Sequence, residues 1–187
     1  MIRIARDDDA DAIHAIYAPI VRDSAITFET EIPTTETLRE RMRAKLQHYP
    51  WLVWEEADEV LAYAYAGRFR ERAAYDWIAE TSIYVHAAAR RRGIARQLYD
   101  ALLEVMRMQG INQAVGVITL PGETSVAMHE AMGFEPAGVW RQAGYKLGRW
   151  WDVGVWQKTL QAPRNPPTPL VHFAQIPPSV LSWRMQS

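Results

Sequence analysis

The sequence predicts an α+β fold in one domain, on three observations. Two apolar and aromatic runs within residues 51–67 are separated by a short acidic turn, which is the pattern of a β-hairpin. Apolar residues recur at helical spacing over 94–105, and a continuous apolar run follows at 114–120. At 187 residues, the chain is long enough to bury a full core without disulfides or metals.

The expected elements alternate along the chain. They are an edge strand at 2–5, a helix carrying Ile13, Ile16, Tyr17 and Ile20, a loop at 24–33, a charged helix from about 34 to 47, the hairpin at 51–67, a loop at 68–77, a strand at 79–85, a helix at 93–109, a strand at 114–120, a short helix at 123–132 and two strands within 137–159. Carboxylates at 7–9 suit the start of the first helix, and Thr34 or Thr35 the start of the second. Gly110 and Gly133 suit the ends of the later helices.

The strand at 79–85 has two different faces, because successive side chains of a strand point to opposite sides. One face holds Ala79, Thr81, Ile83 and Val85, and the other holds Glu80, Ser82 and Tyr84. The first face is suited to a core, whereas the second places a carboxylate among polar neighbours.

The chain divides at about residue 160. Six prolines lie beyond it, at 163, 166, 167, 169, 177 and 178. We therefore expect a domain over 1–160 and a Pro-rich tail over 161–187 without regular structure, which is disordered or lies on the surface or on a partner subunit.

Composition excludes several classes of function. Twenty-one basic and 22 acidic residues nearly balance, so neither nucleic acid nor a membrane is an expected partner. The absence of cysteine excludes disulfides, thiolate metal sites and a cysteine nucleophile, and no metal is expected. No apolar run approaches the roughly 20 residues of a membrane span, and the start of the sequence does not resemble a signal peptide. The expected location is the cytoplasm.

The segment from Ser82 to Ala95 predicts an anion site built from backbone. A strand ends, the chain turns through small residues, and Arg90-Arg91-Arg92-Gly93 opens a helix. Consecutive N–H groups then meet the positive end of the helix dipole, which suits a pyrophosphate. A run of arginines can also be a solvated face. Gly93 favours the anion site, because a side chain there would obstruct the approach of a phosphate.

The pattern R-x-x-G-x-A in this loop is that of the coenzyme A loop of the GNAT superfamily of N-acetyltransferases. Seven further segments resemble its phosphinothricin and methionine sulfoximine N-acetyltransferases, over roughly residues 2–160. They are T-F-E-T-E (27–31), Y-P-W-L-V (49–53), A-Y-A-G (64–67), A-Y-D-W (74–77), S-V-A-M-H-E-A-M-G-F (125–134), A-G-Y-K-x-G-R-W (143–150) and D-V-G-V-W-Q (152–157). The resemblance implies the GNAT fold, a mixed and mostly antiparallel sheet splayed at the cofactor site and flanked by helices. It also implies acetyl-CoA as co-substrate and a homodimer, with the aromatic strands after residue 137 at the interface.

The resemblance also implies a set of cofactor-binding residues. They are Ile83, Tyr84, Val85, Arg90, Arg91, Arg92, Gly93, Ile94, Ala95, Arg96 and Gly122. The backbone of the strand ending at Val85 would pair with the pantetheine arm, and the Val85 N–H would donate to the thioester carbonyl. Ile83 and Val85 also read as core residues, which is compatible because their side chains and backbone act separately.

Two catalytic candidates follow from the same resemblance. Glu80 is the candidate general base, since an alkylammonium cannot attack until it loses a proton. Its structural alternative is a strand carboxylate paired with an arginine. His129 is the candidate general acid or second base, at the position where many GNAT enzymes have tyrosine. Its alternative is a partly buried structural histidine.

The acceptor pocket is expected at two loops. Its candidate residues are Phe28, Glu29, Thr30, Arg72 and Tyr75, with Arg72 clamping an acid group of the substrate. Alternatively, the arginines of 68–72 are a solvated loop and Phe28 belongs to the core. We expect Tyr145 and Trp150-Trp151 in the core or at a dimer surface instead of at the ligand.

The sequence departs from the family pattern at two places. Gly122 stands in L-P-G where L-P-N is usual, so it can start a helix through its backbone but brings no side-chain hydrogen bond. Coenzyme A binding is then weaker or relies on backbone. Thr119 stands where a glycine normally allows close approach, which alters the shape of the acceptor pocket.

The resulting hypothesis is direct acetyl transfer, in a ternary complex, from acetyl-CoA to the amino group of a small amino-acid-like substrate. Phosphinothricin, methionine sulfoximine and methionine sulfone are the implied acceptors. One alternative is acetylation of peptide or protein N-termini, which predicts an open groove instead of a pocket roofed by residues 24–33 and 68–77. Another is a non-catalytic acetyl-CoA sensor, which would not need Glu80 and His129 together.

Overall fold

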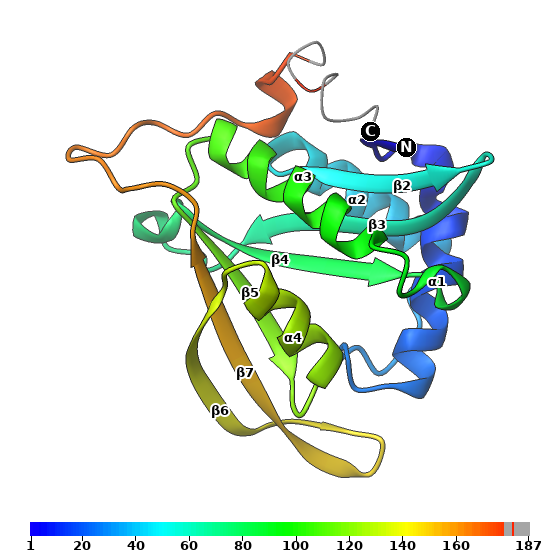
Figure 1. Ribbon diagram of the computed structural model, residues 1–187. Helices are drawn as coiled ribbons and strands as arrows, with labels where there is room; N and C mark the ends of the chain where they lie inside the picture. Colours follow the sequence, from blue (N-terminus) through cyan, green and yellow to red (C-terminus); the bar gives the residue numbers. More distant parts are fainter. Residues whose placement is uncertain (178–180, 182–187) are drawn as a thin grey trace.

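The computed structural model of the protein describes residues 1–177 and 181. Its strands are β1 (Ile2–Ile4), β2 (Trp51–Glu56), β3 (Glu59–Arg68), β4 (Ile78–Val85), β5 (Gln113–Thr119), β6 (Glu135–Lys146) and β7 (Arg149–Thr159). Its helices are α1 (Ala10–Asp23), α2 (Thr35–His48), α3 (Ile94–Met108) and α4 (Glu123–Ala131). The strands form one sheet in the order β1-β2-β3-β4-β5-β7-β6 (Figure 1). Every neighbouring pair in it is antiparallel except β4 and β5. The mixed, mostly antiparallel α+β prediction is confirmed.

The sheet separates two layers of helices. α1 and α2 cover one face, while α3 and α4 cover the other (Figure 1). On the α3 side, Leu98 and Leu102 pack against alanines of β3 in the larger core. On the other side, Ile13 of α1 and Met42 of α2 pack against Val53 of β2. This arrangement follows from helices that are apolar on one side only.

The start of α2 is capped as the sequence predicts, whereas the start of α1 is not. The hydroxyl of Thr34 accepts from the Thr37 N–H at 3.1 Å, which caps α2 as expected. The expectation that an aspartate caps α1 directly is wrong for Asp9, which makes no capping hydrogen bond to α1. Its carboxylate accepts instead from the Arg6 N–H at 2.6 Å, which closes a 3₁₀ turn over Asp7–Asp9.

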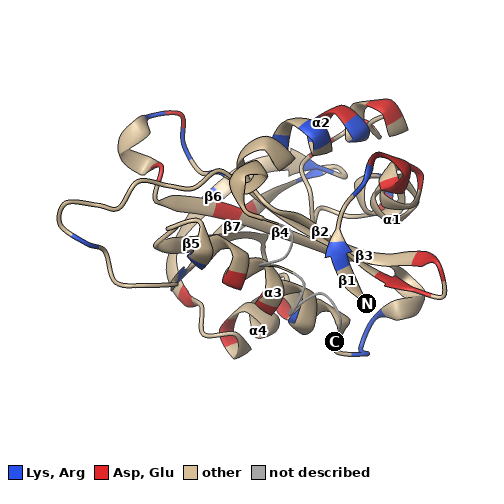
Figure 2. Ribbon diagram, turned by 90° about the horizontal axis from the view of Figure 1, so that it is seen from above, with Lys and Arg blue, Asp and Glu red and all other residues tan. Residues whose placement is uncertain are grey.

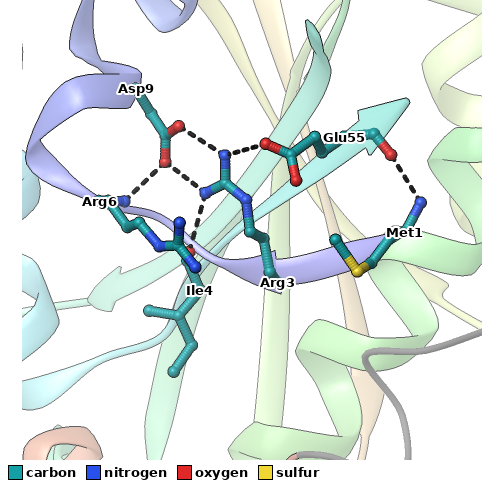
Figure 3. Close-up of polar contacts among 6 residues, drawn as sticks. All are labelled: Met1, Arg3, Ile4, Arg6, Asp9 and Glu55. Carbon is teal, nitrogen blue, oxygen red and sulfur yellow. Dashed lines mark hydrogen bonds and ion pairs between the residues drawn. The ribbon is translucent and has the colours of Figure 1, made fainter. Parts of the chain in front are cut away.

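Asp9 also anchors the first strand. The Arg3 guanidinium donates to both oxygens of Asp9, at 2.7 and 2.8 Å, and to Glu55 at 2.6 Å (Figure 3). These charges lower the pKa of the Glu55 carboxyl, chiefly through the hydrogen bond from Arg3. The cluster therefore ties β1, the start of α1 and the end of β2 together.

The sheet opens between β4 and β5. The parallel pairing ends at Thr81 and Gly116, although β4 continues to Val85 and β5 to Thr119. The N–H of His86 donates to Leu61 in β3 at 2.8 Å. Because N–H groups alternate between the two edges of a strand, those of residues 83 and 85 face the opening on the β5 side.

The tail is packed against the domain (Figure 1). Phe173 and Ile176 are buried against Val105 of α3, and the Trp77 indole donates to the carbonyl of Thr168 at 2.8 Å. A 3₁₀ turn at Phe173–Gln175 corrects the expectation that this segment has no regular structure. The part of the predicted tail at 178–180 and 182–187 lies outside the described residues.

The β6–β7 hairpin carries exposed aromatic side chains. Trp140 is 44% exposed, and Tyr145 and Trp150 are each 59% exposed. A core position for Tyr145 and Trp150, one of the two expected alternatives, is therefore wrong. Charge is mixed elsewhere, as on α2, which carries both acidic and basic residues (Figure 2). Among the described helices, none has both the length and the apolar character to cross a bilayer.

Candidate active site

Glu80 lies on the α1/α2 face of the sheet, one residue before the opening. It pairs across the sheet with Gly67 of β3. Lys45 of α2 lies over the same place, since a Cβ built on Gly67 would be 2.5 Å from Lys45 Nζ. Burial raises the pKa of Glu80, and the positive charges of Lys45 and Arg70 oppose that rise. A carboxylate with a raised pKa holds a proton more strongly than an ordinary glutamate, which suits a general base.

The structure does not pair Glu80 with an arginine, which was its alternative role. Among the described residues, no ion pair within 4.0 Å involves Glu80. Burial also lowers the pKa of Lys45, which Glu80 partly offsets. The two groups interact through charge without a close contact.

His129 lies on the opposite face, over the last pair of the parallel ladder. It is 4% exposed, and burial lowers its pKa. A Cβ on Gly116 would be 2.6 Å from its imidazole. Nδ1 lies 2.8 Å from the carbonyl oxygen of Ser125, and Nε2 lies 3.1 Å from the hydroxyl of Tyr99. The ring is thus buried and held at both nitrogens.

The arginine-rich turn lies where α3 begins. Gly93 starts α3 with φ +78°, a left-handed conformation, and no side chain caps the first turn. The first N–H groups of α3 therefore have no partner in the helix. Arg90 and Arg91 are exposed, whereas Arg92 pairs with Glu56 at 2.8 Å.

The remaining predicted cofactor-binding residues lie at the start of α3 and at the end of β4. The side chain of Ile94 is buried in the core, so only its backbone is free for a ligand. Ala95 is half-buried and Arg96 exposed. Ile83 and Val85 pack against the larger core, while the Tyr84 ring lies 5.1 Å from Tyr17 on the other face.

Gly122 starts α4 with φ +42° and no side-chain cap. A Cβ there would lie 2.5 Å from the carbonyl oxygen of Thr119. In the conformation that this chain adopts, the position leaves no room for a side chain, so the backbone accommodates the departure from asparagine. Thr119 is half-buried at the end of β5, opposite Val153.

The predicted acceptor residues are only partly brought together. Phe28 packs on Gly144 of β6, where a Cβ would collide with its ring. Glu29 is bound by Arg41 at 2.6 Å and by the Tyr17 hydroxyl at 3.1 Å. Thr30 lines a cavity of about 590 Å³ with residues 145–147.

The other two predicted acceptor residues lie on the loop at 68–77. Arg72 is exposed at the start of a 3₁₀ turn, and Tyr75 stands edge-on to Phe69, with ring centroids 5.9 Å apart. Their neighbour Arg70 lies over Phe69 at 4.7 Å and over Trp140 of β6 at 5.9 Å. This loop therefore reaches β6 through a cation–π contact.

Sequence reasoning missed several residues of the site: Lys45, Arg70, Thr81, Tyr99 and Trp140. Lys45 and Arg70 lie in charged segments, where a pattern favours solvent exposure. Tyr99 lies on the apolar side of α3 and reads as core. Only the packing of α2 on β3 brings Lys45 near Glu80, and only the packing of α3 on the sheet brings Tyr99 to Thr81 and His129.

A second cavity, of about 620 Å³, lies beside the tail. Lys45, Arg68, Trp77, Gln109 and His172 are among its lining residues. It lies at the other end of β4 from the opening. Among residues 1–177 there is no group of three or more His, Asp or Glu side chains placed to hold a metal ion.

A sheet opened beside the start of a helix, at its parallel pair of strands, is the architecture of acyltransferases of the GNAT class. The family description "Acetyltransferase (GNAT) domain" matches residues 2–155, so the chain belongs to this family. It is an acetyl-CoA-dependent N-acetyltransferase.

Three known proteins are similar to this chain in sequence or structure. Phosphinothricin N-acetyltransferase of Streptomyces viridochromogenes is 39% identical, over 94% of this chain and 95% of its own. The L-methionine sulfoximine/L-methionine sulfone acetyltransferase of Pseudomonas aeruginosa is 35% identical, over 89% and 98%. A crystal structure of a phosphinothricin acetyltransferase from Sinorhizobium meliloti in complex with acetyl-CoA superposes with a TM-score of 0.85 at 32% identity, covering 92% and 97%.

Proposed function

We propose that the protein transfers acetyl from acetyl-CoA directly to the amino group of a small amino-acid-like substrate, in a ternary complex. Phosphinothricin, methionine sulfoximine and methionine sulfone are the first candidates, because they are the acceptors named for its relatives. The observation that supports this most is Glu80, a carboxylate beside the opened sheet whose pKa is raised by burial. No cysteine is present for a thioester intermediate on the enzyme, which favours direct transfer.

The residues around the opening fit acetyl-CoA. The N–H groups of Ile83 and Val85 face the unpaired edge of β4, where pantetheine amides can bind as a strand would. The free N–H groups at the start of α3, with Arg90 and Arg91, suit the pyrophosphate. Gly122 lets the start of α4 approach closely. When bound, acetyl-CoA supplies the activated acetyl thioester.

Each catalytic candidate then has a separate task. Glu80 takes a proton from the substrate ammonium, directly or through one water, which frees the amine to attack. The N–H of Val85 stabilises negative charge on the thioester oxygen. His129, buried on the cofactor side, is the candidate for the proton of the departing sulfur or for a second base. Because both of its ring nitrogens are hydrogen-bonded within the protein, it would exchange this proton without a direct contact to substrate or cofactor.

The acceptor site would be formed by the loops at 24–33 and 68–77. Arg72 and Arg70 present guanidinium groups for the acid groups of the substrate, and Tyr75 and Phe28 present aromatic surface. Glu29 and Thr30 are retained as candidates for this pocket. The cation of Lys45 offers a further contact near Glu80.

We infer a homodimer that covers the aromatic β6–β7 hairpin, because large exposed aromatic patches mark protein interfaces. Sedimentation at several concentrations tests this. A cytoplasmic location also stays a prediction, which fractionation of cells tests.

The function is tested with purified protein and an acceptor panel. Coenzyme A release is followed with methionine sulfoximine, methionine sulfone, phosphinothricin, other amino acids and N-terminal peptides, and products are identified by mass. Acetylation of the small amino-acid analogues is the expected result. Preference for peptides would replace the proposal with N-terminal acetylation, and saturable acetyl-CoA binding without turnover on any amine would indicate a sensor.

A further inference from the structure

Both ring nitrogens of His129 are occupied within the protein. A carbonyl oxygen can only accept, so Nδ1, at 2.8 Å from the Ser125 carbonyl, carries a hydrogen. In the neutral ring, Nε2 must then be an acceptor, and the Tyr99 hydroxyl at 3.1 Å donates to it. His129 therefore has no nitrogen free for a direct contact with substrate or cofactor.

The hydrogen-bond chain continues beyond Tyr99. The Tyr99 hydroxyl also bonds Thr81 Oγ1, and Thr81 Oγ1 lies 3.0 Å from the carbonyl oxygen of Val115. Tyr99 is fully buried and Thr81 is 5% exposed, so water does not compete freely for these groups. Each hydroxyl has a single hydrogen, so the direction of one bond fixes the direction of the next.

Two arrangements satisfy this chain. With a neutral His129, Thr81 donates to Tyr99, and Tyr99 donates to Nε2. When Nε2 gains a proton, it donates to Tyr99, Tyr99 donates to Thr81, and Thr81 donates to the Val115 carbonyl. Each hydroxyl keeps its own hydrogen and only rotates it, and the added proton comes from water or from the reacting groups.

We infer that Thr81 and Tyr99 are positioning residues that control the proton state of His129 through a hydrogen-bond chain that reverses direction when the ring gains a proton. Thr81 is the last residue of β4 that pairs with β5, and it follows Glu80. The chain thus runs from the opening of the sheet to His129. Its role in turnover rests on the proposed function, whereas the chain itself does not.

The charges around the ring are the same in every variant used below. The charged side chains on the elements packed around it are Glu80 on β4; Arg96, Asp100, Glu104 and Arg107 on α3; Glu123 and Glu130 on α4; Glu135, Arg141 and Lys146 on β6; and Arg149, Asp152 and Lys158 on β7. Glu130 accepts from the Trp156 indole, and Lys158 donates to the Met132 carbonyl. Differences in the His129 pKa between variants of Thr81 or Tyr99 therefore report on the chain.

The test is NMR titration of the histidine rings in the full-length protein without ligands, with the His129 signals assigned by their loss in His129→Gln. The wild-type ring is expected as the Nδ1–H tautomer. Thr81→Val should lower its pKa by about 1, the worth of one hydrogen bond, because Tyr99 loses its acceptor in the protonated arrangement. Thr81→Ser retains the hydroxyl and should restore the wild-type value. Tyr99→Phe should lower the pKa further, since Nε2–H then has no partner.

An Nε2–H tautomer in the wild type, or equal pKa values in the Val and Ser variants, would overturn the inference. If Thr81→Val does not fold, Tyr99→Phe against wild type decides the question by the same measurement. In the pH profile of kcat, the pKa that is lost in His129→Gln should shift in Thr81→Val and return in Thr81→Ser. Inactive protein with the predicted NMR shifts would reject the proposed function but retain the chain.

Discussion

The imidazole of His129 rests directly against Gly116, so that β5 has no room for a side chain where it last pairs with β4. A Cβ at Gly116 would come within 2.6 Å of both Cδ2 and Nε2. The glycine does not serve a turn at this position, because it lies within a regular strand. It serves the close approach of the histidine ring to the sheet.

Gly116→Ala should therefore displace His129 and break its hydrogen bond with Tyr99. We expect a loss of about 1–3 kcal/mol in the free energy of unfolding, as for overpacking, and a clear fall in kcat. Gly138→Ala is the matched control, since a Cβ there meets nothing within 4 Å. Urea unfolding and steady-state kinetics measure both, and an active, fully stable Gly116→Ala protein would contradict the packing.

Glu80→Gln should lower kcat/KM for the acceptor by about 10²–10⁴-fold, because the amide cannot take the ammonium proton. Binding of acetyl-CoA, measured by calorimetry, should stay near the wild-type value. Glu59→Gln, on the exposed start of β3, should behave as wild type. Retention of most of the activity in Glu80→Gln would move the base to another group.

Lys45→Met should raise the pKa of Glu80, because a cation that favours the carboxylate is removed. As the proposed general base, Glu80 would act in its ionised form, so activity should rise as pH increases through this pKa. The acid limb of the kcat/KM profile should therefore move to higher pH in Lys45→Met. Lys45→Arg keeps the charge and should keep the limb in place. A limb unchanged in both variants would show that Glu80 does not control it.

The double change Arg90→Gln and Arg91→Gln should raise the KM for acetyl-CoA by about 10-fold or more, because two charge-assisted hydrogen bonds to phosphate are lost. The effect should shrink at high salt, which screens exposed charges. Arg164→Gln, on the exposed tail, controls for the loss of charge alone. An unchanged KM would place the nucleotide elsewhere.

Phe173→Ala should destabilise the protein by about 3 kcal/mol, since it removes a buried aromatic ring. The ring is 5% exposed and packs on α3 with Val105. Val171→Ala, at a site that is 40% exposed, should cost far less. Chemical unfolding separates the two, and equal stabilities would mean that the tail adds little to the fold.

Local patterns carried most of the fold. The two-residue period of 79–85 predicts both faces of β4. Gly93 marks the start of α3, because glycine readily adopts the left-handed backbone conformation found there. The acetyltransferase family was recognisable from short segments, and the comparisons confirm it. The roles of individual site residues stay predictions.

Groups that meet through tertiary packing were not predictable in this way. Lys45 reaches Glu80 only because α2 crosses β3, and Tyr99 reaches His129 only because α3 and α4 share one face. The many prolines of the tail predict an irregular segment, but they give no sign that Phe173 is buried, because a chain without regular structure can still place one ring in a core. Residues that are far apart in the sequence give no local pattern from which such contacts could be predicted.

The alternation of Glu80 and Thr81 on β4 has a consequence for redirecting this enzyme to new amines. Libraries restricted to Arg70, Arg72 and Tyr75, in the loop proposed to bind the acceptor, would leave the face of β4 that carries Thr81 untouched. Acceptor preference and the hydrogen-bond chain at Thr81 could then be varied separately.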